Sequence, residues 1–268
     1  MSLPENMDQF ATLVDIIARL RDPGGCPWDR EQTHLSLREN LLEECYEVIE
    51  AIDNNDPEHL KEELGDLILQ PIFHSAIAIE KNEFDINDVI AGICEKLVRR
   101  HPHVFGELEI RDSNAQIENW EKIKASEKAG ERKSALCGVP PHLPALLKAQ
   151  KITEKAARVG FDWENTDQVV AKIVEELKEL EESMAVRDKE RMEAELGDLL
   201  FAVVNLGRFL SLDSEGALRK TIARFTKRFS YIEETLLADG ITLQDATLDR
   251  MEQLWGEAKV LEGSSRGK

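Results

Sequence analysis

An acidic pattern occurs twice along the chain, and the two copies lie 132 residues apart. Each copy has two adjacent glutamates, a third glutamate shortly after them and, further on, a glutamate and an aspartate three positions apart. The first copy comprises Glu43, Glu44, Glu47, Glu63 and Asp66, and the second comprises Glu175, Glu176, Glu179, Glu195 and Asp198. Because both order and spacing are kept, we expect the chain to contain two copies of one structural unit.

Apolar residues recur at intervals of three and four along almost the whole chain, and no segment alternates in the manner of a strand. This periodicity predicts an all-α fold. Ser36 with Glu39 three residues later predicts a capping box at the start of a helix that runs to about Ile52. Asp56 followed by Pro57 predicts the start of the next helix. The first acidic pattern therefore lies on two antiparallel helices joined by a short turn.

The segment 125–134 is polar, and the segment that follows it is rich in proline. Such composition is typical of a connection between domains. We therefore expect an N-terminal helical-bundle unit over residues 1–130, a linker over 131–142 and a C-terminal unit of the same kind over 143–268. Within the C-terminal unit we expect helices over about 143–158, 167–186, 188–210, 214–238 and 245–259.

The acidic side chains of each copy share helix faces. At 100° per residue, Glu44 and Glu47 lie about 60° apart around the helix axis, and the next helix brings Glu63 and Asp66 opposite them. Several negative charges in so small a volume repel one another unless a cation is present. Oxygen ligands favour Mg²⁺, or Mn²⁺, over zinc, and magnesium commonly binds a phosphate beside a few carboxylates. The pattern therefore indicates a site for a magnesium–phosphate substrate.

A glycine precedes the aspartate in both copies, at Gly65 and Gly197. Glycine inside a helix costs about 0.5–1 kcal/mol relative to alanine. We therefore expect another segment to approach the helix backbone closely at both positions, as tight helix packing alone would also require.

Basic and aromatic residues repeat as well, with their spacing of four residues intact. Cations one helical turn apart can hold phosphate oxygens, and a tryptophan with a lysine four positions later offers a ring face and a charge. We therefore expect a nucleotide to bind these residues. They are Lys96, Arg100, Trp120 and Lys124 in the first half and Arg224, Arg228, Trp255 and Lys259 in the second.

Charge and hydropathy exclude some partners. The formal net charge of −19 repels nucleic acid backbones and anionic membranes, so polymeric nucleic acid is not expected as a partner. The four cysteines form no CxxC pair, which argues against a zinc ribbon and a redox site. The most apolar run, residues 67–79, is interrupted by Gln70, Pro71 and His74. We therefore expect a cytoplasmic protein without a membrane span.

The acidic patterns resemble the EExxE and ExxD signature of the MazG family of all-α nucleoside triphosphate pyrophosphohydrolases. The signature stands here as Glu43-Glu44-Cys-Tyr-Glu47 with Glu63-Leu-Gly-Asp66, and as Glu175-Glu176-Leu-Lys-Glu179 with Glu195-Leu-Gly-Asp198. The likeness extends over nearly the whole chain, including the entries to the two units at 26–29 and 160–163.

This resemblance implies a homodimer of helical bundles with Mg²⁺ at the acidic residues. It also implies hydrolysis of a (deoxy)nucleoside triphosphate between the α and β phosphates, which yields a nucleoside monophosphate and pyrophosphate. A role in nucleotide-pool cleansing or stress-related nucleotide control would follow.

The two halves differ near the acidic residues. Asn205 lies seven positions after Asp198, about 20° away around the helix axis, where its amide could reach a nucleotide or a ligand water. The first half has Phe73 at that position, with Gln70 and His74 near the same face. We expect the C-terminal unit to be the better catalyst, with its five acidic residues as the catalytic set. Which glutamate activates water stays open.

Three other functions compete with this interpretation. A di-metal oxidase on a ferritin-like bundle needs Glu-x-x-His pairs, and the only match, Glu31 with His34, lies outside the repeated helices. A non-catalytic helical adaptor would use the acids only for solubility and would bind no metal. A related phosphohydrolase would act on a deoxy or damaged nucleotide, a dinucleotide or an alarmone.

Overall fold

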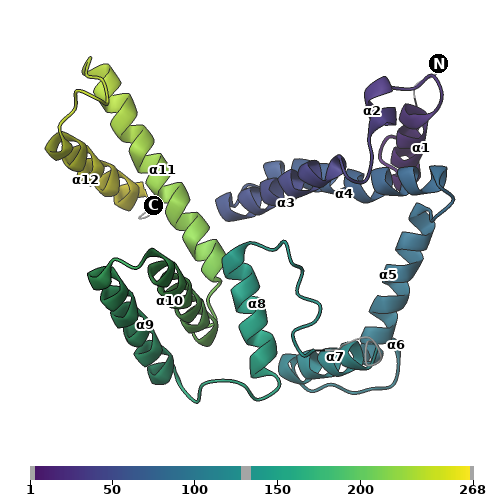
Figure 1. Ribbon diagram of the computed structural model, residues 1–268. Coiled ribbons are helices and arrows are strands. Elements are labelled where there is room, and N and C mark those ends of the chain that lie inside the picture. Colours follow the sequence, from purple (N-terminus) through teal and green to yellow (C-terminus); the bar gives the residue numbers. More distant parts are fainter. Residues whose placement is uncertain (1–3, 128–133, 266–268) are drawn as a thin grey trace. The chain divides into compact units, whose positions relative to one another are not determined.

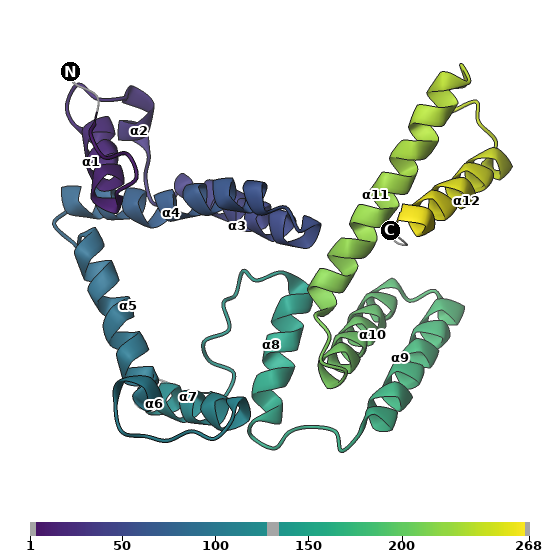
Figure 2. The same cartoon turned by 180° about the vertical axis from the view of Figure 1, so that it is seen from behind.

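The computed structural model describes residues 4–127 and 134–265, and all regular structure in this part of the chain is helical (Figures 1 and 2). The predicted all-α fold is confirmed. Two compact units comprise residues 1–129 and 130–268. Residues 131–133 of the expected linker lie outside the described residues. Among the helices described, none is both long and apolar enough to cross a bilayer.

The N-terminal unit is built around a helical hairpin. Its helices α3 and α4 run antiparallel, and α1 packs against α4 (Figure 1). A core of Ile17, Leu37, Ile72, Phe73 and Ile77 lies where these helices meet. The helices are α1 (Phe10–Arg21), α2 (Pro27–Glu31), α3 (Leu37–Asn54), α4 (Pro57–Glu80), α5 (Ile86–Arg100), α6 (Pro102–Phe105) and α7 (Ser113–Glu127).

The turn between α3 and α4 follows from local sequence. Asn55 takes a left-handed conformation with φ 53°, and the Asp56 carboxylate accepts hydrogen bonds from the next helix's backbone amides, including that of His59 at 3.1 Å. The predicted capping box at Ser36 is wrong. Ser36 has helical backbone angles, and its hydroxyl accepts from the Thr33 amide at 2.9 Å instead of capping α3. The side chain is therefore used in the preceding turn.

The C-terminal unit contains a second hairpin, formed by α9 and α10. Helix α8 packs against α10, and α12 packs against α11 (Figures 1 and 2). Its helices are α8 (Ala145–Ala157), α9 (Thr166–Val186), α10 (Lys189–Phe209), α11 (Ser214–Ala238) and α12 (Leu248–Ser265). All five expected helices are present. The last one continues to Ser265 rather than ending near residue 259, so Glu262 is helical.

The two helical glycines do not serve the expected purpose. A Cβ built at Gly65 or Gly197 would meet no atom within 4 Å beyond the helix's own backbone. The prediction of close approach by another segment is therefore wrong for the described chain.

Arg21 ties α1 to α4 and to the loop around α2. Only 8% of the residue is exposed. Its Nε and Nη2 donate to the two carboxylate oxygens of Glu80 at 2.7 and 2.9 Å, and Nη1 donates to the backbone carbonyls of Asp29 and Gln32. Its Cζ lies 5.3 Å from the centre of the Phe73 ring. This guanidinium therefore holds three segments of the N-terminal unit together.

This contact predicts a pH dependence. The hydrogen bonds from Arg21 hold the pKa of Glu80 below its ordinary value. Ionised Glu80 therefore adds stability that is present above its unfolded-state pKa and is lost as the pH falls through the folded-state pKa. We expect the Tm of the wild type to fall more steeply than that of Glu80→Gln between about pH 5 and pH 3. Thermal unfolding followed by circular dichroism tests this, and equal slopes would contradict it.

Candidate active site

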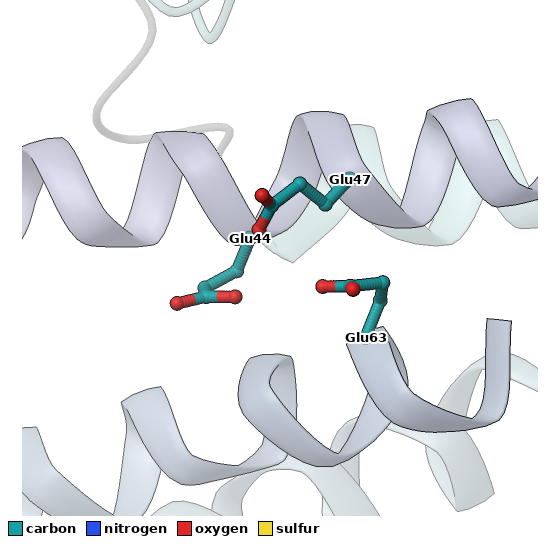
Figure 3. Close-up of side chains that lie close together, drawn as sticks. All are labelled: Glu44, Glu47 and Glu63. Atoms are coloured by element: carbon teal, nitrogen blue, oxygen red, sulfur yellow. The ribbon is translucent and has the colours of Figure 1, made fainter. Parts of the chain in front are cut away.

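The hairpin of the N-terminal unit brings carboxylates of both helices together. Glu44 and Glu47 project from α3 toward Glu63 on α4 (Figure 3). One oxygen from each of the three lies within 4.8 Å of the others. Glu63 is buried, and the other two are half-buried. Asp66 and Glu43 lie outside this triad and are exposed. Three of the five predicted residues thus form a compact group.

The C-terminal hairpin gathers all five of its predicted carboxylates. Glu175, Glu176 and Glu179 of α9 form one group, and Glu176 forms a second with Glu195 and Asp198 of α10. Within each group one oxygen per residue lies within 4.8 Å of the others. Glu176 belongs to both groups and is only 5% exposed. It is therefore the central residue of this acidic set.

Burial and mutual repulsion disfavour the charged forms of these groups. The pKa of Glu44 is raised by burial and then by the nearby charges of Asp66 and Glu47. Burial and repulsion from Glu63 likewise raise the pKa of Glu47. A donor set made of carboxylate oxygens, held together against its own repulsion, fits a hard divalent cation.

Basic residues contact both acidic sets. His59 Nε2 lies 2.9 Å from Glu63 Oε1, and Arg191 Nε lies 3.2 Å from Glu195 Oε1. These two residues are also 132 positions apart, so they belong to the repeat. Neither residue is among those predicted from the sequence, although each stands four residues before its glutamate, a spacing typical of helical ion pairs.

Lys172 distinguishes the C-terminal set. Its Nζ lies 2.6 Å from Glu175 and 2.7 Å from Glu176, and these hydrogen bonds raise the pKa of the lysine. The corresponding residue of the N-terminal unit is Asn40. This lysine is also not among the residues predicted from the sequence, although it stands four residues before Glu176. The C-terminal set therefore carries an ammonium group that the N-terminal set lacks.

A cavity of about 570 Å³ lies beside the C-terminal set. Glu176, Asp198 and Lys172 contribute to its lining. Most of the remaining wall is apolar and includes the rings of Phe161, Trp163 and Phe201. This volume is within the range of small-molecule sites, and an aromatic wall beside carboxylates suits a ligand with one planar and one anionic end.

Asn205 lines the same cavity and is 8% exposed. Its counterpart Phe73 instead belongs to the N-terminal core beneath Arg21. Near Phe73, His74 Nδ1 lies 2.8 Å from His34 Nδ1, and burial lowers the pKa of His74. Gln70 is buried at 5% exposure. Equivalent positions of the two hairpins therefore line a cavity in one unit and fill a core in the other.

Two residues that were predicted to bind a nucleotide, Arg228 of α11 and Trp255 of α12, contact each other. Arg228 donates through Nε and Nη2 to Glu262 at 3.0 and 2.7 Å, and its Cζ lies 5.3 Å from the Trp255 ring centre. Phe225 also lies against this ring, with centroids 5.1 Å apart. The ring face expected for a base is therefore already in contact with protein groups.

The N-terminal unit repeats this arrangement on α5 and α7. Arg100 donates to Glu127, and its Cζ lies 5.4 Å from the Trp120 ring centre. Glu127 and Glu262 are 135 positions apart, like the tryptophans before them. We call each trio of arginine, tryptophan and glutamate a clasp. Neither glutamate is among the residues predicted from the sequence, although both stand seven residues after a tryptophan.

Four predicted residues of the C-terminal unit, Arg224, Arg228, Trp255 and Lys259, are absent from the cavity lining. Arg224 Nη2 donates to Thr221 Oγ1 at 2.8 Å. Lys96 and Lys124 lie on α5 and α7 of the N-terminal unit, with Arg100 and Trp120. Within the described C-terminal unit, Asn205 is therefore the predicted nucleotide-binding residue that the fold brings to the cavity.

The fold and these sites define a class of protein: a tandem all-α chain with a carboxylate-bearing hairpin in each half. The MazG nucleotide pyrophosphohydrolase domain matches residues 32–105 and 164–231. The chain belongs to this family. Enzymes of the family are generally metal-dependent.

Individual relatives match nearly the whole of this chain. The chain is 48% identical to the nucleoside triphosphate pyrophosphohydrolase/pyrophosphatase MazG of Thermotoga maritima, covering 93% of this chain and 95% of that protein. It is 44% identical to the nucleoside triphosphate pyrophosphohydrolase of Escherichia coli K12, covering 94% and 98% respectively. It is also 48% identical to protein YabN of Bacillus subtilis, over 96% of this chain and 53% of that protein.

The clasp of the C-terminal unit predicts a stability effect. The side chains of Arg228 and Glu262 are 18% and 17% exposed. We expect Glu262→Gln to cost about 1–2 kcal/mol, because it removes the negative charge that strengthens the partly buried hydrogen bonds from Arg228. Asp239→Asn is the matched control, since it removes the charge from the more exposed pair between Asp239, which follows the last residue of α11, and Arg250 of α12. Thermal unfolding should show a clearly smaller loss for the control, and equal losses would contradict the prediction.

Proposed function

We propose that this chain is a Mg²⁺-dependent nucleoside triphosphate pyrophosphohydrolase whose principal active site lies in the C-terminal unit. Family membership supports the activity. The observation that carries the assignment to the C-terminal unit is the cavity beside Glu176 and Asp198. An apolar, aromatic wall accommodates a base and sugar, while the acidic end lies where a metal-bound phosphate tail would be placed.

The five carboxylates of the C-terminal hairpin would hold Mg²⁺, or Mn²⁺ as a substitute. Glu44, Glu47 and Glu63 of the N-terminal hairpin, which the fold brings together, would hold the same ion. When bound, the ion supplies positive charge that neutralises phosphate oxygens and stabilises the charge developing on them. Lys172 lies in the same set and would donate to a phosphate oxygen once its contacts to Glu175 and Glu176 are exchanged.

The reaction joins water to the triphosphate and breaks the bond between its α and β phosphates. The oxygen of water bonds to phosphorus, and the bridging oxygen leaves with the pyrophosphate. One carboxylate of the set orients this water or accepts its proton. The products are a nucleoside monophosphate and pyrophosphate. In a cell this reaction would serve nucleotide-pool cleansing, and we place it in the cytoplasm.

Matching exposed apolar residues support a homodimer. Leu64 and Leu196 occupy equivalent positions and are 42% and 47% exposed, and Ile68 and Leu200 are 46% and 49% exposed. These large apolar side chains form an exposed face on each hairpin. Association of two chains would remove such faces from water. A second copy of the chain offers the same faces by symmetry.

Separate substitutions test which unit carries the activity. We expect Glu176→Ala to reduce Mg²⁺-dependent pyrophosphate release at least about 100-fold, because it removes the carboxylate common to both groups. Glu44→Ala should leave most of the release intact. Glu181→Ala, an exposed acid of α9 outside the set, is the matched control and should behave as wild type. Loss confined to Glu44→Ala would assign the principal site to the N-terminal unit instead.

The dimer proposal has its own test. Light scattering coupled to size exclusion should give twice the chain mass of 30.4 kDa. Leu200→Glu should shift the protein toward one chain mass, because it places a charge in the apolar contact. Lys220→Glu, a change at a polar position of α11, is the control and should keep the dimer. A wild-type mass of one chain would refute the proposal.

A further inference from the structure

The orientation of the Asn205 amide is set by Arg208. Arg208 Nε lies 2.8 Å from Asn205 Oδ1, one turn earlier on α10. A guanidinium has only donors, so the amide atom that faces it must be the oxygen. The Nδ2 group of Asn205 therefore points away from Arg208.

Asp162 holds Arg208 from its other side. Arg208 Nη1 donates to Asp162 Oδ2 at 3.0 Å, and Nη2 pairs with Oδ1. The contact lowers the pKa of Asp162, and the side chains of Arg208 and Asp162 are 14% and 28% exposed. All three residues line the cavity. Hydrogen bonds link Asp162 to Arg208 and Arg208 to Asn205, and they fix which end of the Asn205 amide is free.

The free end of the amide is a donor on the wall of the cavity. Among the described residues, Nδ2 of Asn205 has no hydrogen-bond partner, although the residue is 8% exposed. An amide donor that no protein acceptor engages is available to an acceptor atom of a ligand in the cavity. Asn205 therefore presents two N–H groups to whatever occupies the cavity.

A nucleotide whose phosphates bind at Asp198 would reach Asn205 with its base. Asp198 and Asn205 lie on one face of α10, about 10 Å apart along the helix axis. With the phosphates at Asp198, the base lies toward Asn205, and the rings of Phe161, Trp163 and Phe201 suit its planar faces. The sugar bridges the two ends.

We propose that Arg208, held by Asp162, is a positioning residue that makes Asn205 a hydrogen-bond donor to the base, so that this cavity selects bases with an exocyclic carbonyl over bases with an exocyclic amino group. This inference rests on the proposed function and names the substrate class of that site. The N-terminal unit has Phe73 and Ala76 in place of Asn205 and Arg208, so the selection belongs to the C-terminal unit.

Matched pairs of substrates test the inference. ITP and ATP differ chiefly in a carbonyl against an amino group, as do UTP and CTP. For the wild type we expect kcat/KM to be about 10 times higher or more for ITP than for ATP, and likewise for UTP than for CTP. We call this quotient the ratio of the pair. Asn205→Asp keeps an oxygen toward Arg208 but turns the donor into an acceptor, so the ratio should fall at least about tenfold.

Arg208→Met tests the positioning role. Without the guanidinium the Asn205 amide can rotate and present either its oxygen or its nitrogen to the base. The ratio of kcat/KM values within each substrate pair should therefore approach one. A merely structural role would lower kcat/KM for both members of a pair and leave their ratio unchanged. Arg250→Met, which breaks the surface pair with Asp239, is the matched control and should keep the wild-type ratio.

The outcomes separate this inference from the proposed function. A wild-type ratio near one, or a ratio unchanged by both Asn205→Asp and Arg208→Met, overturns the inference while hydrolysis stands. Failure of all four nucleotides to release pyrophosphate overturns the proposed function. In that case calorimetric binding of non-hydrolysable ITP and ATP analogues still tests the selection, because equal affinities would overturn it.

Discussion

Repulsion between carboxylates packed into a helical hairpin is the constraint on which both units depend. Each hairpin turns back within a few residues, so glutamates on its first helix face acids on its second. Burial strengthens the repulsion and raises the pKa values of Glu44, Glu47 and Glu179. Such an arrangement is maintained against its own electrostatic cost. Lys172 offsets this cost in the C-terminal set, and a bound divalent cation would offset it in both.

The two units meet this constraint differently. The C-terminal set holds Lys172 and lies beside a cavity with aromatic walls. The N-terminal hairpin has Asn40 instead of that lysine and places Phe73 in a core stabilised by Arg21. One duplicated scaffold thus supports a ligand-sized cavity in one unit and a closed core at the equivalent positions in the other. This difference explains why we assign the principal activity to the C-terminal unit.

Local sequence predicted the helices well where a cap or a period defines them. Asp56 caps α4 as its sequence indicates, and the hairpins follow from short turns between periodic segments. Prediction failed where another group competes. The Ser36 hydroxyl bonds within its own turn, and Glu262 lies on a helix end that extends past the expected boundary. The spacing of residues along the chain reveals neither the hydrogen bond of Ser36 nor the longer helix α12, because both depend on which groups are near in space.

The sequence by itself determined the repeat, the all-α class and eight carboxylates that the hairpins gather, because helical periodicity converts spacing along the chain into a shared face. Only the tertiary structure decided what surrounds those carboxylates. Whether position 205 or 73 lines a cavity depends on how α8 and α1 pack against the hairpins, and the donor facing the cavity depends on Arg208 reaching Asp162 across 46 residues of chain. Such contacts join segments distant in sequence, so no local pattern records them.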